Sequence, residues 1–76
     1  MNPELSGMSN EELIQWTCIN APITEEDMRC VFPDIDAFCA QNPVELPDFI
    51  GALVRCTRLG ITSLYEAIEV IKCICV

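Results

Sequence analysis

The C-terminal stretch 62–76, TSLYEAIEVIKCICV, most constrains what this chain can fold into. Its apolar residues lie on one side of a helix and extend around the cylinder, so that only Ser63, Glu66, Glu69 and Lys72 are left to face water. A helix this apolar either stands at the centre of a small bundle or covers another chain. We therefore expect an all-α fold whose C-terminal helix is central or lies at an interface.

Capping signals mark the first and last helices. Ser9 and Glu12 form a capping box, which predicts a helix from position 10 to about position 20. Ser63 and Glu66 repeat the pattern before the terminal helix. Gly60 has the form of a left-handed C-cap that closes the helix before it.

Threonine and proline mark the helices between these two. Thr24 caps a second helix, which carries three acidic residues in its first turn. Pro33 is expected to stop that helix and to begin a third, short one that ends in the turn 41–43. Pro47 begins a further helix where its missing amide costs least. The sequence thus predicts a compact bundle of four to five short helices.

The length of 76 residues allows a single domain. We expect a lead-in segment over residues 1–8 and one helical domain over residues 9–76. A domain of this size buries only about 60% of the surface that its unfolded chain exposes, so its stability is expected to be small. Hydrophobic residues make up 51% of the chain, which argues against disorder despite a net charge of −8.

Acidic residues concentrate in the first two-thirds of the chain. Residues 1–48 hold ten Asp and Glu against Arg29 alone, whereas residues 49–76 hold two acids and three basic residues. Phosphate backbones are bound through Lys and Arg, so we expect no direct contact with nucleic acid. An acidic face either binds a basic surface of a partner protein or only keeps the chain soluble. The candidate partner-binding residues are Glu11, Glu12, Glu25, Glu26, Asp27, Asp34 and Asp36.

Six cysteines and no histidine limit the chemistry that the chain can perform. Structural zinc sites use two close ligand pairs, and only Cys73 and Cys75 form one, so we expect no metal and no cofactor. A nucleophilic cysteine needs a base, and the usual one is missing. The carboxylate pairs stand at helix N-termini, where the helix dipole explains them without a substrate. We expect no catalytic residue and no enzymatic activity.

Nothing in the sequence indicates a secretory leader or a membrane span. The N-terminal MNPELSGMSNEEL lacks the basic and apolar regions of a signal peptide, and no apolar run approaches about 20 residues. We therefore expect a cytoplasmic protein that makes no contact with a membrane, with its cysteines as free thiols. Disulfides remain the alternative, because an even number of cysteines in a short chain is typical of a disulfide scaffold.

The segment 48–72 has the outline of a helix-turn-helix. A DNA-reading second helix needs basic and amide side chains, whereas this one offers Tyr65, Glu66 and Glu69 among aliphatic residues. The turn 59–61, Leu-Gly-Ile, is similar to the one before the last helix of sterile alpha motif domains, but the rest of the chain does not follow that pattern. The outline therefore does not predict a DNA-binding function.

Together, these features predict a small acidic protein-binding module. We expect an inhibitor or adaptor that docks on a basic surface, for example a phage-encoded or immunity-type blocker of a nucleic-acid-handling enzyme. The alternative is a self-assembly module that forms a homodimer through its C-terminal helix. A redox or metal protein that uses Cys73 and Cys75 is a further alternative. The candidate self-association residues are Tyr65, Ile68, Val70 and Ile74.

Overall fold

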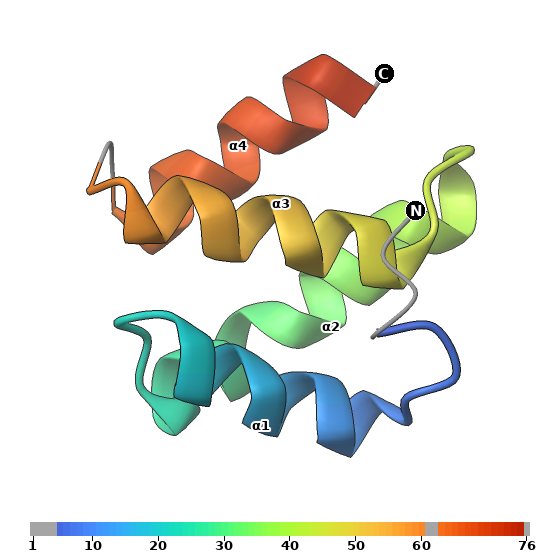
Figure 1. Ribbon diagram of the computed structural model, residues 1–76. Helices are drawn as coiled ribbons and strands as arrows, with labels where there is room; N and C mark the ends of the chain where they lie inside the picture. Colours follow the sequence, from blue (N-terminus) through green and yellow to red (C-terminus); the bar gives the residue numbers. More distant parts are fainter. Residues whose placement is uncertain (1–4, 61–62, 76) are drawn as a thin grey trace.

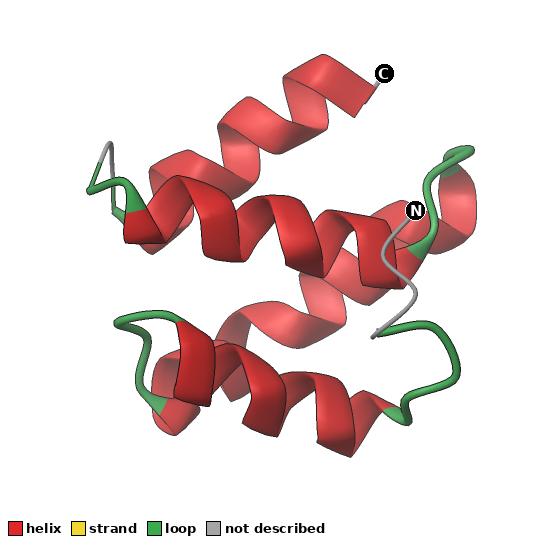
Figure 2. Cartoon of the chain, viewed as in Figure 1, coloured by secondary structure: helices red, strands yellow, loops and turns green. Residues whose placement is uncertain are grey.

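The computed structural model describes residues 5–60 and 63–75, except for the side chain of Cys75. These residues form four helices. They are α1 (Asn10–Asn20), α2 (Glu25–Gln41), α3 (Leu46–Arg58) and α4 (Leu64–Cys75). No strand occurs in these two ranges, and short turns connect the helices (Figures 1 and 2). The prediction of an all-α bundle is confirmed, with four helices.

The predicted capping signals are present in the structure. The amide of Glu12 donates to Ser9 Oγ at 3.2 Å, and the amide of Ser9 donates to Glu12 Oε1 at 2.9 Å. Thr24 Oγ1 accepts from the amide of Asp27 at 3.1 Å and begins α2. Ser63 Oγ accepts from the amide of Glu66 at 3.4 Å ahead of α4. These side chains satisfy amides that the first turn of a helix leaves without a partner.

Helix α2 continues through Pro33, so the prediction that Pro33 ends one helix and begins another is wrong. Buried side chains recur at helical spacing on both sides of it, so that one apolar stripe faces the core. Each of these side chains contributes about 1.5–3 kcal/mol on burial, and together they exceed the ~3 kcal/mol that an interior proline costs. Pro33 itself is exposed, so its ring faces solvent. The stripe consists of Met28, Val31, Phe32 and Ile35.

Helix α3 lies at the centre of the bundle, so the prediction of a C-terminal helix that is central or at an interface is confirmed only in part. It packs against α1, α2 and α4, and Figure 1 shows it between α4 and the α1–α2 pair. Phe49, Ile50 and Leu53 are each at most 1% exposed. Thr57 is also buried, and its hydroxyl donates to the Leu53 carbonyl at 3.0 Å, which satisfies the polar atom.

Helix α4 packs against one side of α3 and exposes its own opposite side to solvent. Ala67, Ile68 and Ile71 are buried and Leu64 packs against the core, whereas Tyr65, Val70 and Ile74 are exposed. The turn before it contains Gly60 at φ +67°, the left-handed conformation that the sequence predicts at this C-cap. No helix in the described ranges is long and apolar enough to cross a membrane.

The described part of the N-terminal lead-in packs onto the helices. Leu5 is fully buried in the core, and Met8 is half-buried against it. The amide of Met8 donates to the Leu5 carbonyl at 3.2 Å, which folds the segment back before α1 begins. Met8 therefore reaches the surface beside the first turn of α1, a position that matters for the site described next.

Candidate protein-binding surface

Arg29 of α2 joins two of the predicted contact residues. Its guanidinium donates to both carboxylate oxygens of Glu11 in α1, with Nη1 at 3.0 Å from Oε2, and its Nε donates to Glu25 Oε2 at 2.9 Å. The hydrogen bond from Arg29 lowers the pKa of Glu11, and the bonds to Glu11 and Glu25 raise the pKa of Arg29. Glu11 therefore ties α1 to α2 through Arg29, whereas Glu25 pairs with Arg29 within α2.

Glu12 and Asp34 also have structural partners. Hydrogen bonds from Ser9, of which the backbone bond is the stronger, lower the pKa of Glu12. Asp34 accepts a hydrogen bond from Lys72 Nζ at 2.7 Å, which links α2 to α4. The same bond raises the pKa of Lys72, whose Nζ lies 5.6 Å from the centre of the Phe38 ring. Asp34 thus holds the terminal helix in place.

Glu26, Asp27 and Asp36 are exposed and have no ion pair with any described residue. At 100° per residue, Asp36 lies on the row of Glu25 and Arg29, which faces α1. Asp27 lies on the row of Asp34, on the opposite side of α2, and Glu26 points outward between them. The seven predicted contact residues therefore surround the outer surface of α1 and α2 and do not form one patch.

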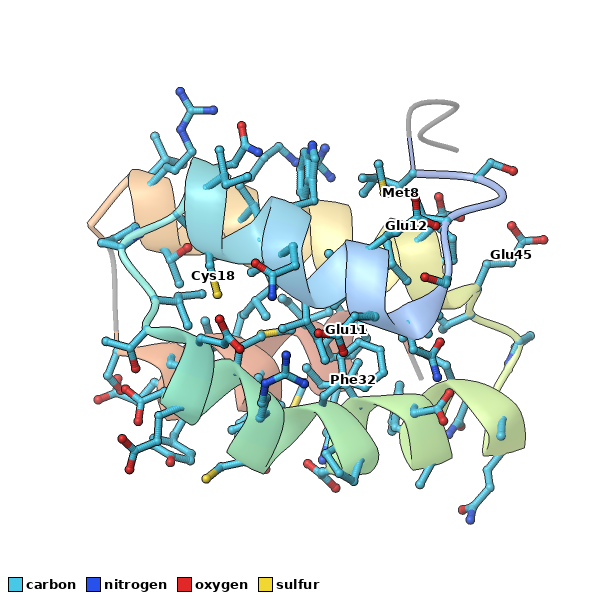
Figure 3. All side chains as sticks on the ribbon, turned by 90° about the horizontal axis from the view of Figure 1, so that it is seen from below. Met8, Glu11, Glu12, Cys18, Phe32 and Glu45 are labelled. Carbon is cyan, nitrogen blue, oxygen red and sulfur yellow. The ribbon has the colours of Figure 1, made fainter. Side chains whose placement is uncertain are left out.

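The two adjacent glutamates of α1 point in different directions. Figure 3 shows Glu11 between α1 and α2, near Phe32, whereas Glu12 lies beside Met8. A shallow depression runs over the outer surface of α1, and Ile19 at its far end is 81% exposed. We call this surface the α1 face. It is lined by Met8, Glu11, Glu12, Gln15, Trp16 and Ile19.

Sequence reasoning did not assign Met8, Gln15 or Ile19 to a site. The sequence did contain a signal for this apolar surface, because Trp16 and Ile19 are three residues apart and therefore lie on one side of a helix. That side differs from the buried one, which is formed by Leu13, Ile14 and Thr17. Trp16 is half-buried, so it packs against the core and also lines the depression.

The predicted self-association residues of α4 do not share one face. Ile68 is 3% exposed and belongs to the core. Tyr65 lies on one edge of the buried stripe, and Val70 and Ile74 lie on the other, one turn apart. Val70 is 48% exposed and Ile74 is 76% exposed, so these two residues form a small apolar surface.

A basic surface lies at the C-terminal end of α3. Arg55 and Arg58 line a second depression together with Leu59, which is 73% exposed. Cations at this end of a helix are favoured by the helix dipole, as the sequence predicts. This surface is distinct from the α1 face, and no residue lines both depressions.

The cysteines are dispersed over the four helices. No disulfide joins Cys18, Cys30, Cys39, Cys56 or Cys73 in the described part of the chain. Burial, with a smaller contribution from Glu25, raises the pKa of Cys18, which disfavours its thiolate. Among the described residues no group of three His, Cys, Asp or Glu side chains could hold a metal ion. The side chain of Cys75 lies outside that description.

Comparisons with protein-family models, curated proteins and solved structures find no match. The functional interpretation therefore depends on the surface itself. Its two carboxylates with lowered pKa, Glu11 and Glu12, stay ionised at neutral pH. Fixed charges of this kind suit the recognition of cationic groups.

Proposed function

We propose that this chain is a small acidic protein-binding module, an inhibitor or adaptor that docks on a basic surface of a partner protein. The observation that carries the proposal is the separation of charge between two pairs of helices. Helices α1 and α2 hold seven acidic residues and one arginine, a net charge of −6. Helices α3 and α4 hold three acidic and three basic residues, which cancel.

Internal ion pairs leave most of this negative charge in place. Arg29 neutralises one of the two carboxylates that it contacts, and Lys72 compensates Asp34. Glu26, Asp27 and Asp36 remain exposed on α2 and available to a partner. Charges of one sign spread over a surface raise the rate of association with an oppositely charged surface and fix its orientation.

Occlusion is the mode of action that follows from this distribution. A basic surface that binds an anionic polymer is blocked when a compact acidic domain occupies it. An inhibitor of a nucleic-acid-handling protein would work in this way, and an adaptor would use the same contacts to link two proteins. Under this proposal the protein acts in the cytoplasm, where its free thiols remain reduced.

The test compares two variants with equal loss of charge. Glu26→Gln, Asp27→Asn and Asp36→Asn together remove three negative charges from α2, and Glu45→Gln, Glu66→Gln and Glu69→Gln remove three elsewhere. The wild type and both variants are immobilised, and proteins that they retain from host extract are compared over a range of salt concentrations. We expect a retained basic protein that the first variant loses at lower salt than the wild type, while the control keeps it. Equal loss from both variants would show that the acidic surface acts only through net charge.

Self-association through α4 is the second candidate function. Val70 and Ile74 form an exposed apolar pair on a helix whose buried side packs against α3. A C2 dimer would bring this pair against its own copy. Sedimentation equilibrium of the wild type and of the Val70→Ser, Ile74→Ser variant tests it. A mass equal to the monomer at every concentration would exclude this candidate.

A further inference from the structure

The α1 face combines exposed apolar side chains with fixed negative charge. Met8, Trp16 and Ile19 supply the apolar part, and Ile19 is one of the most exposed large hydrophobic residues among those described. An exposed isoleucine beside a half-buried tryptophan and methionine gives a partner apolar area to cover. Aromatic side chains such as Trp16 are also favoured as anchors of protein interfaces.

The rim of this face is acidic. Glu11 and Glu12 lie at the end of the face where α1 begins, and Gln15 follows one turn later. None of the six lining residues is basic. The charge of both carboxylates is held by hydrogen bonds, Glu11 through Arg29 and Glu12 through Ser9. Any ligand of this face must therefore combine an apolar surface with positive charge.

The size of the face limits what can occupy it. From Glu11 to Ile19 the axis of α1 rises about 12 Å, which is a little over two helical turns. A partner helix lying along it would place apolar residues at spacings i, i+3 or i+4, and i+7 against the apolar side chains. Lysine or arginine residues flanking that stripe would reach Glu12 and would share Glu11 with Arg29.

We propose that the α1 face binds a basic amphipathic helix of the partner protein. This inference rests on the proposed function and deepens it, because it names the surface and the chemistry of the segment that docks there. A second copy of this face is disfavoured as occupant, since both faces would carry negative charge and none of the lining residues is basic. The basic surface of Arg55, Arg58 and Leu59 on a second copy is the alternative that the experiment must exclude.

Trp16 provides a direct readout, because it is the only tryptophan in the chain. The probe is a synthetic helix-forming peptide of leucine and lysine, without tryptophan, whose leucines form one stripe. Its control is a peptide of the same composition with the stripe scrambled. We expect a saturable blue shift of Trp16 emission with the amphipathic peptide, an affinity that falls with added salt, and at least fivefold weaker binding of the scrambled peptide.

Two pairs of matched variants locate the contact. Ile19→Ser and Ile74→Ser each remove an isoleucine that is 81% or 76% exposed on a helix, so neither disturbs the core. We expect about tenfold weaker peptide binding for Ile19→Ser and less than twofold change for Ile74→Ser. Glu12→Gln removes charge from the α1 face and keeps the capping box, because glutamine also serves at that position. Its control is Glu66→Gln, and we expect severalfold weaker binding only for Glu12→Gln.

Four results would overturn this inference. Equal effects of Ile19→Ser and Ile74→Ser, or no response to the peptide, would show that the α1 face is not the docking site. Binding seen by calorimetry without a change in Trp16 emission would place the peptide elsewhere on the acidic surface, which leaves the proposed function intact. A blue shift that grows with protein concentration alone, and that Arg55→Gln with Arg58→Gln abolishes, would assign the face to a second copy. Failure of the proposed function itself would appear in the extract experiment, as the absence of any retained basic protein.

Discussion

The two halves of the molecule differ in how they use their side chains. Helix α3 is buried on most of its circumference and, with α4, carries no net charge. Helices α1 and α2 each bury one stripe, and together they carry a net charge of −6. The two halves thus share the packing of the core, whereas the α1–α2 half supplies most of the charged surface. Substitutions at buried positions and on the acidic surface should therefore separate stability from binding.

The largest effect is expected from the centre of α3. Leu53 is fully buried, so Leu53→Ala should lower the free energy of unfolding by about 2–5 kcal/mol, which is a large part of the stability of a small domain. The control is Leu59→Ala at the end of the same helix, where the side chain is 73% exposed. Urea denaturation followed by circular dichroism should place the control within about 0.5 kcal/mol of the wild type. Similar losses for both variants would contradict a core centred on α3.

Removal of the interior proline should have the next largest effect. Pro33→Ala restores a backbone hydrogen bond within α2 and removes the ring, so we expect the free energy of unfolding to rise by about 1–3 kcal/mol. Pro43→Ala is the control, because Pro43 lies in the turn between α2 and α3. There the substitution should lower stability by about 0.4–1 kcal/mol, since it makes the unfolded chain more flexible. A loss of stability from Pro33→Ala would instead support two separate helices.

A smaller effect is expected at the start of α2. Thr24 caps this helix through its hydroxyl, so Thr24→Ala should cost about 1 kcal/mol in thermal or urea unfolding. Thr24→Ser keeps the oxygen and should retain most of the stability. Equal destabilisation by serine and alanine would show that the hydrogen bond to the Asp27 amide contributes little.

The smallest effect, and the one that depends on pH, belongs to the ion pair between the helices. The pKa of Glu11 is lowered in the folded chain. The ion pair of Glu11 therefore stabilises the fold fully at pH values above the ordinary pKa of 4.5, and this stabilisation disappears as the pH falls through the lowered pKa. Glu11→Gln should therefore be less stable than the wild type at pH 7, and the two should become equally stable once the pH falls below the lowered pKa of Glu11. Glu26→Gln is the control, since Glu26 holds the same second position of its helix without an ion pair to a described residue. A difference for Glu11→Gln that persists at low pH would exclude the Arg29 pair as its cause.

Local signals in the sequence predicted most helix boundaries, because each boundary depends on a few neighbouring residues. Ser9, Thr24 and Ser63 cap helices, and Gly60 adopts the left-handed turn. Pro33 was misleading because its local preference is weaker than the burial of the stripe that spans it. The burial of α3 at the centre results from contacts among all four helices. Contacts between distant helices cannot be predicted from any single segment of the sequence.

The sequence predicted the acidic character of the candidate site but not the arrangement of its residues in space. That Glu11 and Glu12 point in different directions follows from the helical period alone. The approach of Arg29 to Glu11, 18 residues away, and of Lys72 to Asp34, 38 residues away, depends on tertiary packing. The apolar part of the α1 face was overlooked because Ile19 stands near the end of its helix, where exposure is hard to infer from spacing.

Mapping of the peptide contact by nuclear magnetic resonance tests the central claim most directly. The chain is labelled with ¹⁵N and titrated with the amphipathic leucine–lysine peptide, and the amide shifts of all helices are followed at once. We predict that the largest changes occur between Glu11 and Ile19, that smaller ones occur in the exposed acidic positions of α2, and that α4 is unaffected. Changes centred on Val70 and Ile74 would contradict the assignment of binding to the acidic α1–α2 half, and would assign the binding surface to α4.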